Sequence, residues 1–178
     1  MNGHAPAPGP LRDSSVQPQA AYDVVVVGAG LAGLFAGWLA ARRGARVLVL
    51  ARGHGNLTLG AGTIDVWAHT AAGQPAPNPL AELVWLTASP ATGTPHPLLL
   101  AGLPALRSAV EALQSLCAAA GYPLAGALER NHFLPTALGA FRPTCLAPES
   151  FAAGELRQGS EIALADLRSF RDFYPSFA

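Results

Sequence analysis

A glycine-rich turn between a short strand and a helix constrains the fold of this chain more than any other feature. Val24 to Val27 predict a strand buried on both faces of a parallel sheet, and Gly28-Ala29-Gly30-Leu31-Ala32-Gly33 follows directly with GxGxxG spacing. Apolar residues then recur every three or four positions, as in an amphipathic helix that ends before Gly44, and Arg46 to Ala51 predicts a second strand. Residues 22–51 therefore predict one βαβ unit with parallel strands.

Each glycine of this turn suits a dinucleotide site. Gly28 permits the tight turn, Gly30 lets the backbone approach a pyrophosphate, and Gly33 lets the helix lie close to the sheet while its first amides face the phosphates. The alternative is that the glycines only shape a close-packed turn without a ligand. The strand, turn, helix and strand in sequence favour the dinucleotide.

The residues after the second predicted strand bear on which dinucleotide is bound. An acidic side chain normally binds the ribose there, whereas this chain has Ala51, Arg52 and Gly53. The missing carboxylate weakens the case for ordinary ribose binding. Arg52 suits a 2′-phosphate, as in an NADP site, although an arginine after a strand is more often simply solvated.

Composition excludes several other classes of protein. The chain has 178 residues, enough for about one domain, and its 11 acidic and 11 basic residues exclude a basic nucleic-acid binder. All basic residues are arginine, so a phosphate-loop lysine and a Schiff-base lysine are absent. The histidines lack metal-ligand spacing, so no metal site is expected, and no serine, histidine and acid set indicates hydrolysis.

Two further features need interpretation. The uncharged run from Val24 to Ala41 is long enough to suggest a membrane span or a signal-peptide core, but its glycines favour a strand and helix of a globular domain, and no other segment is long enough to span a bilayer. Cys117 and Cys145 are too far apart for a CxxC pair, and we expect both to be buried thiols in a reducing compartment.

The rest of the chain predicts a disordered tail at 1–20 and a partial FAD/NAD(P)-binding domain at 21–178, with an inserted helical and hairpin segment at about 75–148. The elements predicted beyond the βαβ unit are a short strand at Thr63–Ala68, a helix capped by Asn78 that runs to Leu86, a helix at Pro104–Ala120, a hairpin of Leu128–Leu134 with Ala140–Leu146, a strand at Glu161–Ala165 that returns to the main sheet, and a helix at Leu167–Tyr174.

Several of these segments together resemble the amino-terminal region of the B-subunit family of anaerobic glycerol-3-phosphate dehydrogenase, which belongs to the fumarate reductase-like superfamily of FAD-dependent oxidoreductases. Arg52-Gly53 directly after the second strand is one shared feature. Gly62-Thr63-Ile64-Asp65 is similar to the family's stretch beside the flavin. His96-Pro97, followed by the segment Leu134 to Thr144, is similar to a third family segment. The resemblance spans nearly all of residues 22–172.

The resemblance implies an α/β, Rossmann-like FAD/NAD(P)-binding domain with a parallel sheet. Because family members are much longer, we expect this chain to be an incomplete, amino-terminal fragment of such a domain. The implied cofactor is FAD, with FMN as the alternative. Gly60 and Ala61 stand where relatives often carry serines, so hydroxyl contacts from these positions are lost. The implied cofactor-binding residues are Gly28, Ala29, Gly30, Leu31, Ala32, Gly33, Ala51, Arg52, Gly53, Gly60, Ala61, Gly62 and Thr63.

The resemblance also implies an activity and partners. The reaction is oxidation of glycerol 3-phosphate to dihydroxyacetone phosphate, with electrons passed to quinone in a complex with a catalytic A subunit and an iron-sulfur C subunit. The expected location is the cytoplasm, peripheral at the inner face of the cell membrane through a partner subunit. Two alternatives remain: another FAD-dependent oxidoreductase of the succinate, fumarate or amine type, or a noncatalytic remnant or assembly subunit.

No catalytic residue is assigned. Asp65 and Arg142 are candidates to face the flavin ring or an anionic substrate, but strand-end charges satisfied by the backbone are the simpler interpretation. His54 is a candidate for a flavin or phosphate contact, although a histidine in a glycine-rich loop is more simply an exposed one.

Overall fold

The computed structural model describes residues 21–89, 95–156 and 161–165. The predicted tail at 1–20 and the predicted helix at Leu167–Tyr174 lie outside these residues. The described residues fall into two compact units, one ending at Thr58 and the other beginning at Leu59. The prediction of one partial domain with an inserted segment stays a prediction.

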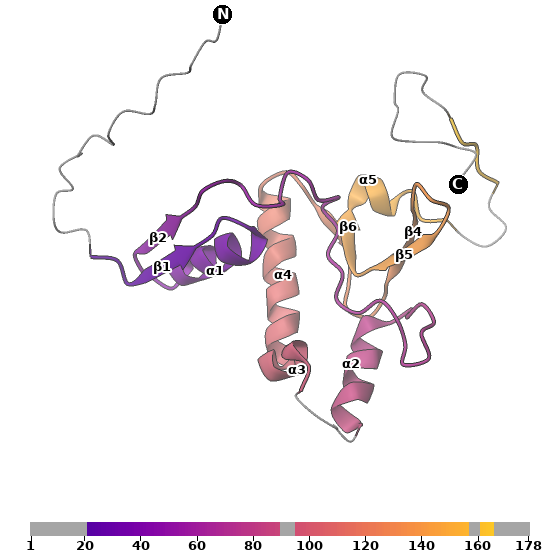
Figure 1. Cartoon of the computed structure of the whole chain (residues 1–178), viewed down its shortest axis with the longest axis horizontal. Coiled ribbons are helices and arrows are strands. Elements are labelled where there is room, and N and C mark those ends of the chain that lie inside the picture. Colours follow the sequence, from indigo (N-terminus) through magenta and orange to yellow (C-terminus); the bar gives the residue numbers. More distant parts are fainter. Residues whose placement is uncertain (1–20, 90–94, 157–160, 166–178) are drawn as a thin grey trace, which may run out of the picture. The chain divides into compact units, whose positions relative to one another are not determined.

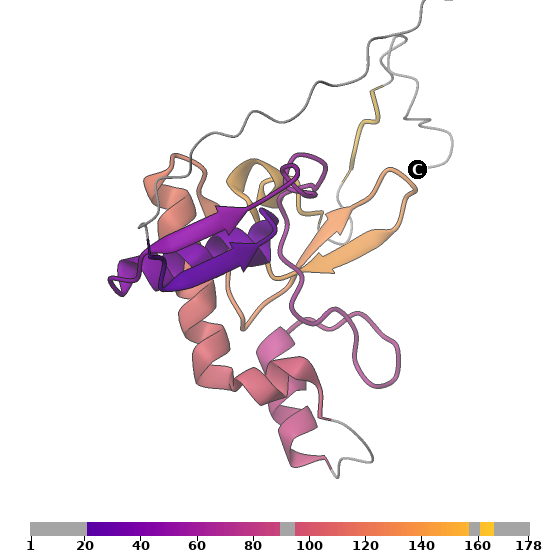
Figure 2. The same ribbon diagram turned by 60° about the vertical axis from the view of Figure 1, so that its left-hand side comes forward.

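The first unit is the predicted βαβ unit. It consists of β1 (Val24–Val27), α1 (Leu31–Arg42) and β2 (Val47–Leu50), with α1 lying along the two strands (Figures 1 and 2). The strands pair in parallel, in a register that places Val24 opposite Val47 and Val27 opposite Leu50. The parallel sheet and its crossover helix are confirmed.

At Gly37, α1 leaves room on this sheet for no more than a small side chain at ordinary contact distance. Gly37 is buried, and a Cβ built on it would lie 3.4 Å from a methyl group of Val47 and 3.6 Å from one of Val26. The helix ends at Arg42, and Gly44 then adopts a φ of +87°, which favours glycine. The opposite face of the sheet is apolar and exposed, with Val27 at 84%.

The second unit contains the other elements (Figure 1). Its helices are α2 (Pro79–Ala88), α3 (Pro97–Ala101), α4 (Leu103–Ala119) and α5 (Glu149–Ala152), and its strands are β3 (Leu124–Gly126), β4 (His132–Pro135), β5 (Phe141–Thr144) and β6 (Leu146–Pro148). The strands form two antiparallel pairs, β3 with β6 and β4 with β5. Among the described helices, none is long and apolar enough to cross a membrane.

The core of the second unit lies where α4 meets β3 and β6. Its buried apolar side chains are Val110, Leu124, Leu128, Cys145 and Leu146. On α4, the Gln114 side chain donates hydrogen bonds of 3.1 Å to the carbonyls of Leu124 and Gly126, so the helix also satisfies backbone groups of β3.

Two predicted helices are confirmed with small changes of boundary. The Asn78 side chain accepts a hydrogen bond of 2.9 Å from the Ala81 amide, as an N-cap residue should, and Pro79 occupies the first turn. The helix at Pro104–Ala120 is α4, and Gly121 follows it with a φ of +75°. The short helix α3 was not predicted, because His96-Pro97 starts a single turn without periodicity.

The strand predictions need more correction. The hairpin exists, but as β4 with β5, and the end of the second predicted strand belongs to β6 instead. Thr63–Ala68 contains only a single bridge, between Ile64 and Leu146, and Glu161–Ala165 has no regular structure. The predicted strands at these two positions are wrong because a short apolar run becomes a strand only when a partner strand is available.

Candidate functional site

The glycine turn of the first unit uses each of its three glycines differently. Gly28 has a φ of +110°, which side chains rarely tolerate. A Cβ on Gly33 would lie 2.2 Å from the Gly28 carbonyl oxygen, so only glycine lets α1 begin this close to β1. A Cβ on Gly30 would have no atom within 4 Å, so this position faces open space. Packing within the described part of the protein therefore does not require a glycine at residue 30, although glycine is a favourable N-cap residue.

The start of α1 suits an anionic group. Gly30 is the N-cap residue, no side chain caps the helix, and its first turn contains no acidic residue. Within the described part of the chain, the amides of Leu31, Ala32 and Gly33 have no hydrogen-bond acceptor, since the first helical bond is from Leu34 to Gly30. Free amides at the positive end of a helix dipole, beside an open glycine, fit the pyrophosphate of FAD.

The segment after β2 folds back toward this turn. Ala51, Arg52 and Gly53 are exposed, and none of them carries the carboxylate that usually binds ribose. Gly55 has a φ of +60°, and a Cβ there would lie 3.1 Å from the Gly30 Cα. The sequence did not predict the contact between Gly55 and Gly30, because the spacing of glycines in a loop does not show which residues the loop will approach.

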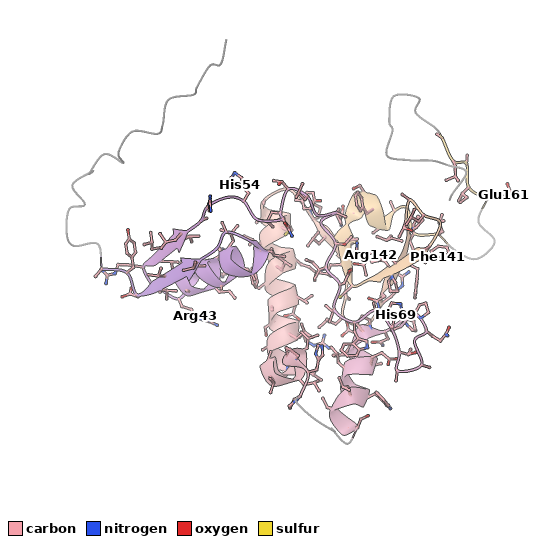
Figure 3. The ribbon with its side chains drawn as sticks, in the orientation of Figure 1. Arg43, His54, His69, Phe141, Arg142 and Glu161 are labelled. Carbon is pink, nitrogen blue, oxygen red and sulfur yellow. The ribbon has the colours of Figure 1, made fainter. Side chains whose placement is uncertain are left out.

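His54 is exposed in the same segment, as Figure 3 shows beyond β2. Arg43, at the end of α1, lies away from the strands in the same figure. The first unit therefore offers backbone amides at its glycine turn, and the exposed Arg52 is a charged side chain in the adjoining segment.

In the second unit, the predicted flavin loop at Gly60, Ala61, Gly62 and Thr63 is anchored by the residue that follows it. The Ile64 amide donates a hydrogen bond of 2.8 Å to the Leu146 carbonyl, and the Ile64 carbonyl accepts from the amides of Cys145 and Leu146. The Thr144 hydroxyl donates to the same carbonyl at 3.2 Å. One end of the loop is therefore fixed to the beginning of β6.

Asp65 and Arg142, 77 residues apart in the sequence, form an ion pair (Figure 3 labels Arg142). Both Nε and one terminal nitrogen of Arg142 donate to a single carboxylate oxygen of Asp65. The interpretation of these charges as satisfied by the backbone is therefore wrong: the two side chains satisfy each other. The pair places a half-exposed guanidinium next to the anchored loop.

A second polar cluster surrounds Glu155, after α5. Its carboxylate, 16% exposed, accepts hydrogen bonds from the Arg130 side chain at 2.6 Å and the Phe133 amide at 3.0 Å, and it lies 3.1 Å from Nδ1 of His132. Burial raises the pKa of Glu155, but the hydrogen bonds from His132, Phe133 and Arg130 outweigh burial and lower it. This cluster joins the end of α5 to β4.

Three polar side chains elsewhere in the second unit, of which Asn131 alone is buried, lie outside this cluster. Asn131 donates to the carbonyls of Trp67 and Ala76 at 2.8 and 2.7 Å, which closes the loop before α2. His96 caps α3 by accepting from the Leu98 amide at 3.2 Å, and its ring lies 5.0 Å from that of Trp67. His69 is exposed near the turn (Figure 3).

The cysteines differ in accessibility. Cys145 is buried, and desolvation by burial, followed by the charges of Glu129 and Asp65, raises its pKa to about 11. Cys117 is only partly buried, so the expectation of two buried thiols holds for Cys145 alone. Across residues 21–89, 95–156 and 161–165, no group of three or more histidine, cysteine, aspartate or glutamate side chains is placed to hold a metal ion.

Comparison with known proteins identifies relatives of this arrangement. The family model described as "FAD binding domain" matches residues 23–178. The chain is 32% identical over 155 residues to the B subunit of the anaerobic glycerol-3-phosphate dehydrogenase of Pectobacterium carotovorum subsp. carotovorum, covering 85% of this chain and 36% of the relative. The corresponding protein of Yersinia enterocolitica is 31% identical over 157 residues, covering 86% of this chain and 37% of the relative. No solved structure matches.

The chain thus spans just over a third of the length of these curated relatives. The resemblance to the B subunit is confirmed, and so is FAD as the cofactor, since the matching domain is the one that binds FAD. The free amides of α1 and the open position at Gly30 fit that cofactor. The chain belongs to the FAD-binding domain family of flavin-dependent oxidoreductases.

Proposed function

We propose that this chain is the FAD-binding part of a glycerol-3-phosphate dehydrogenase subunit that passes electrons to quinone. The observation that carries the proposal is its similarity, over 85% of its length, to proteins named as the B subunit of the anaerobic enzyme. The proposal includes the reaction, oxidation of glycerol 3-phosphate to dihydroxyacetone phosphate, and the partners, a catalytic A subunit and an iron-sulfur C subunit.

The role of the first unit in this proposal is to bind the pyrophosphate. The amides of Leu31, Ala32 and Gly33 donate to phosphate oxygens, and Gly30 allows the phosphates to approach the backbone. No carboxylate directly follows β2 to bind the ribose, so these backbone groups would provide most of the affinity for FAD. When bound, FAD accepts the two electrons that leave the substrate alcohol.

The role of the second unit is to contact the flavin through Gly60, Ala61, Gly62 and Thr63. The proposal also gives Arg142 a role toward the substrate, because its guanidinium is held by Asp65 directly after this loop. Because the carboxylate already restricts the arginine side chain, binding a phosphate group would cost little additional conformational entropy.

The test is an anaerobic reduction experiment. The full chain is loaded with FAD, and glycerol 3-phosphate, succinate and an amino acid are added in separate samples while the visible flavin band is recorded. The proposal expects bleaching by glycerol 3-phosphate alone. Bleaching by succinate or by the amino acid instead would assign the chain to another oxidoreductase, and a bound flavin that no substrate reduces would contradict a catalytic role for this chain.

Partner binding is tested separately. The full chain, carrying an affinity tag, is mixed with the purified A and C subunits of one of the named relatives' complexes, with and without FAD. Retention of both subunits supports the proposal, and retention of neither contradicts the proposed complex.

A further inference from the structure

Tyr122 lies directly against the loop at Gly60 to Thr63. A Cβ built on Gly62 would be 2.8 Å from the Tyr122 hydroxyl oxygen, 3.3 Å from a ring carbon of Pro148 and 3.7 Å from a ring carbon of Tyr122. Gly62 also has a φ of +74°, which disfavours other residues. The loop backbone therefore passes close to the phenol, and the positive φ itself favours glycine at this position.

Tyr122 is held by the end of α4 two residues before β3 pairs with β6, and the loop is held by β6. The Tyr122 amide donates a hydrogen bond of 2.9 Å to the Cys117 carbonyl at the end of α4, and Leu124 pairs with Pro148. The loop is fixed through Ile64, which is hydrogen-bonded to Leu146. The backbone of Tyr122 and the loop are therefore both positioned by the fold of the second unit.

The hydroxyl is available for a ligand. Tyr122 is 52% exposed, and within the described part of the chain its hydroxyl oxygen takes part in no hydrogen bond. Gly60 and Ala61 have no hydroxyl of their own. A phenol both donates and accepts hydrogen bonds, and FAD presents carbonyl oxygens, ring nitrogens and phosphate oxygens as acceptors.

We propose that Tyr122 is a further FAD-binding residue, whose hydroxyl donates a hydrogen bond to an acceptor atom of the cofactor at the Gly60 to Thr63 loop. The inference rests on the proposed function, because it takes this loop as a flavin contact. Tyr122 lies in the connection between α4 and β3, so the proposed site includes a segment that the glycine motif does not indicate.

The experiment compares FAD titrations of the full chain, of Y122F and of Y22F, followed by quenching of flavin fluorescence. Y122F keeps the ring and removes only the hydroxyl, and Y22F removes a comparably exposed hydroxyl that precedes β1. Loss of one hydrogen bond to a ligand weakens binding by about three- to tenfold. We expect this loss for Y122F, together with a shifted visible spectrum of bound FAD, and no change for Y22F.

Thermal unfolding without FAD separates binding from structure. We expect Y122F and the unmodified chain to unfold at the same temperature without FAD, and Y122F to gain less stability when FAD is added. Equal affinity and equal spectra for both proteins would overturn the inference, and so would an affinity loss matched by an equal loss of stability without FAD. If the unmodified chain binds no FAD, the proposed function fails, and that failure is recognised without any variant.

Discussion

Gly33 and Gly30 belong to one motif, but the physical reasons for a glycine at the two positions differ. Gly33 is required by the protein itself, because a methyl group there would lie 2.2 Å from the Gly28 carbonyl oxygen and 3.2 Å from a methyl group of Val26. Gly30 has open space around its Cβ position, so packing does not require a glycine there; its N-cap position and the close approach of a ligand both favour one. A motif that is uniform in sequence therefore combines a packing role at Gly33 with a proposed binding role at Gly30.

The substitution G33A should destabilise the first unit. Relief of the clash requires α1 to move away from β1, and overpacking of this kind costs about 1–3 kcal/mol. Chemical unfolding monitored by circular dichroism measures the loss. G37A is the matched control, because a Cβ there would meet its neighbours at ordinary contact distances of 3.4 Å or more. Equal stability of G33A and the unmodified chain would show that the turn is not packed as described.

Glu155 provides a residue-scale prediction about pH. Its folded-state pKa lies below the ordinary value of 4.5, so its contribution to stability is fully present above that value and is lost as the pH falls through the folded-state pKa. E155Q removes a charged acceptor of three hydrogen bonds and should cost about 2 kcal/mol at pH 7.

Urea unfolding of E155Q at several pH values checks this prediction. The difference from the unmodified chain should narrow as the pH falls below 4.5. E111Q, on the exposed side of α4, is the control and should change little at any pH. A difference between E155Q and the unmodified chain that stays constant down to about pH 3 would contradict the role given to the carboxylate.

At the scale of elements, local capping signals were reliable and strand partners were not. Asn78 followed by Pro79 predicted the start of α2, and the structure has the expected side-chain hydrogen bond. N78A should therefore destabilise α2 by about 1 kcal/mol, measured by thermal unfolding of the full chain. N78S retains a hydroxyl acceptor at the cap and should restore most of the stability. If N78A and N78S unfold alike, the cap does not contribute as described.

The βαβ unit was predictable because its signals are local. The valine run, the glycines and the second apolar run lie within residues 22–51, and the crossover rule then specifies a parallel pair. The strands β3 and β6 were not predictable, because three-residue strands such as Leu124–Gly126 have no measurable alternation. Their pairing depends on Gly126, whose Cβ would lie 2.1 Å from the Cys145 carbonyl oxygen.

In the candidate site, too, local features could be predicted from the sequence and contacts between distant residues could not. The residues of the GxGxxG turn were found from their spacing and from the strands and helix predicted around them, and the turn has free amides beside the open position at Gly30. The contacts of Tyr122 with Gly62 and of Asp65 with Arg142 join residues that are far apart in the chain. Only the folded structure brings such pairs together, so a single sequence has no signal for them.

At the scale of the whole molecule, the two compact units are linked by an exposed segment without regular structure, from Ala51 to Gly62. The segment contains one arginine, Arg52, and the chain has no lysine. Other arginines of the described residues lie in helices, at helix ends or in ion pairs, as Arg107 does with Glu129. Arg52 therefore lies in a longer irregular, exposed segment than Arg43 and Arg46, which stand in the short turn between α1 and β2, and a long segment is the easier one for a protease to cut.

Limited digestion with trypsin should cut the described part of the chain first after Arg52. Mass spectrometry of the fragments at short times identifies the bond, and R52Q, which removes the cleavage site, is the control. Added FAD should slow this cleavage, because the segment is next to the cofactor turn through the contact of Gly55 with Gly30. Earlier cleavage after Arg107, within α4, would contradict the expected order.

The most direct measurement of the central claim, that this chain binds FAD through the amides of its glycine turn, is an FAD titration of the full chain beside G30A. In the protein alone, the added methyl group would meet no atom within 4 Å, so G30A should fold normally, with a stability change below about 1 kcal/mol for the weaker N-cap. We expect saturable, one-to-one FAD binding by the unmodified chain and binding weakened at least about tenfold in a folded G30A. Unchanged affinity in G30A, or no FAD binding by the unmodified chain, would contradict the claim.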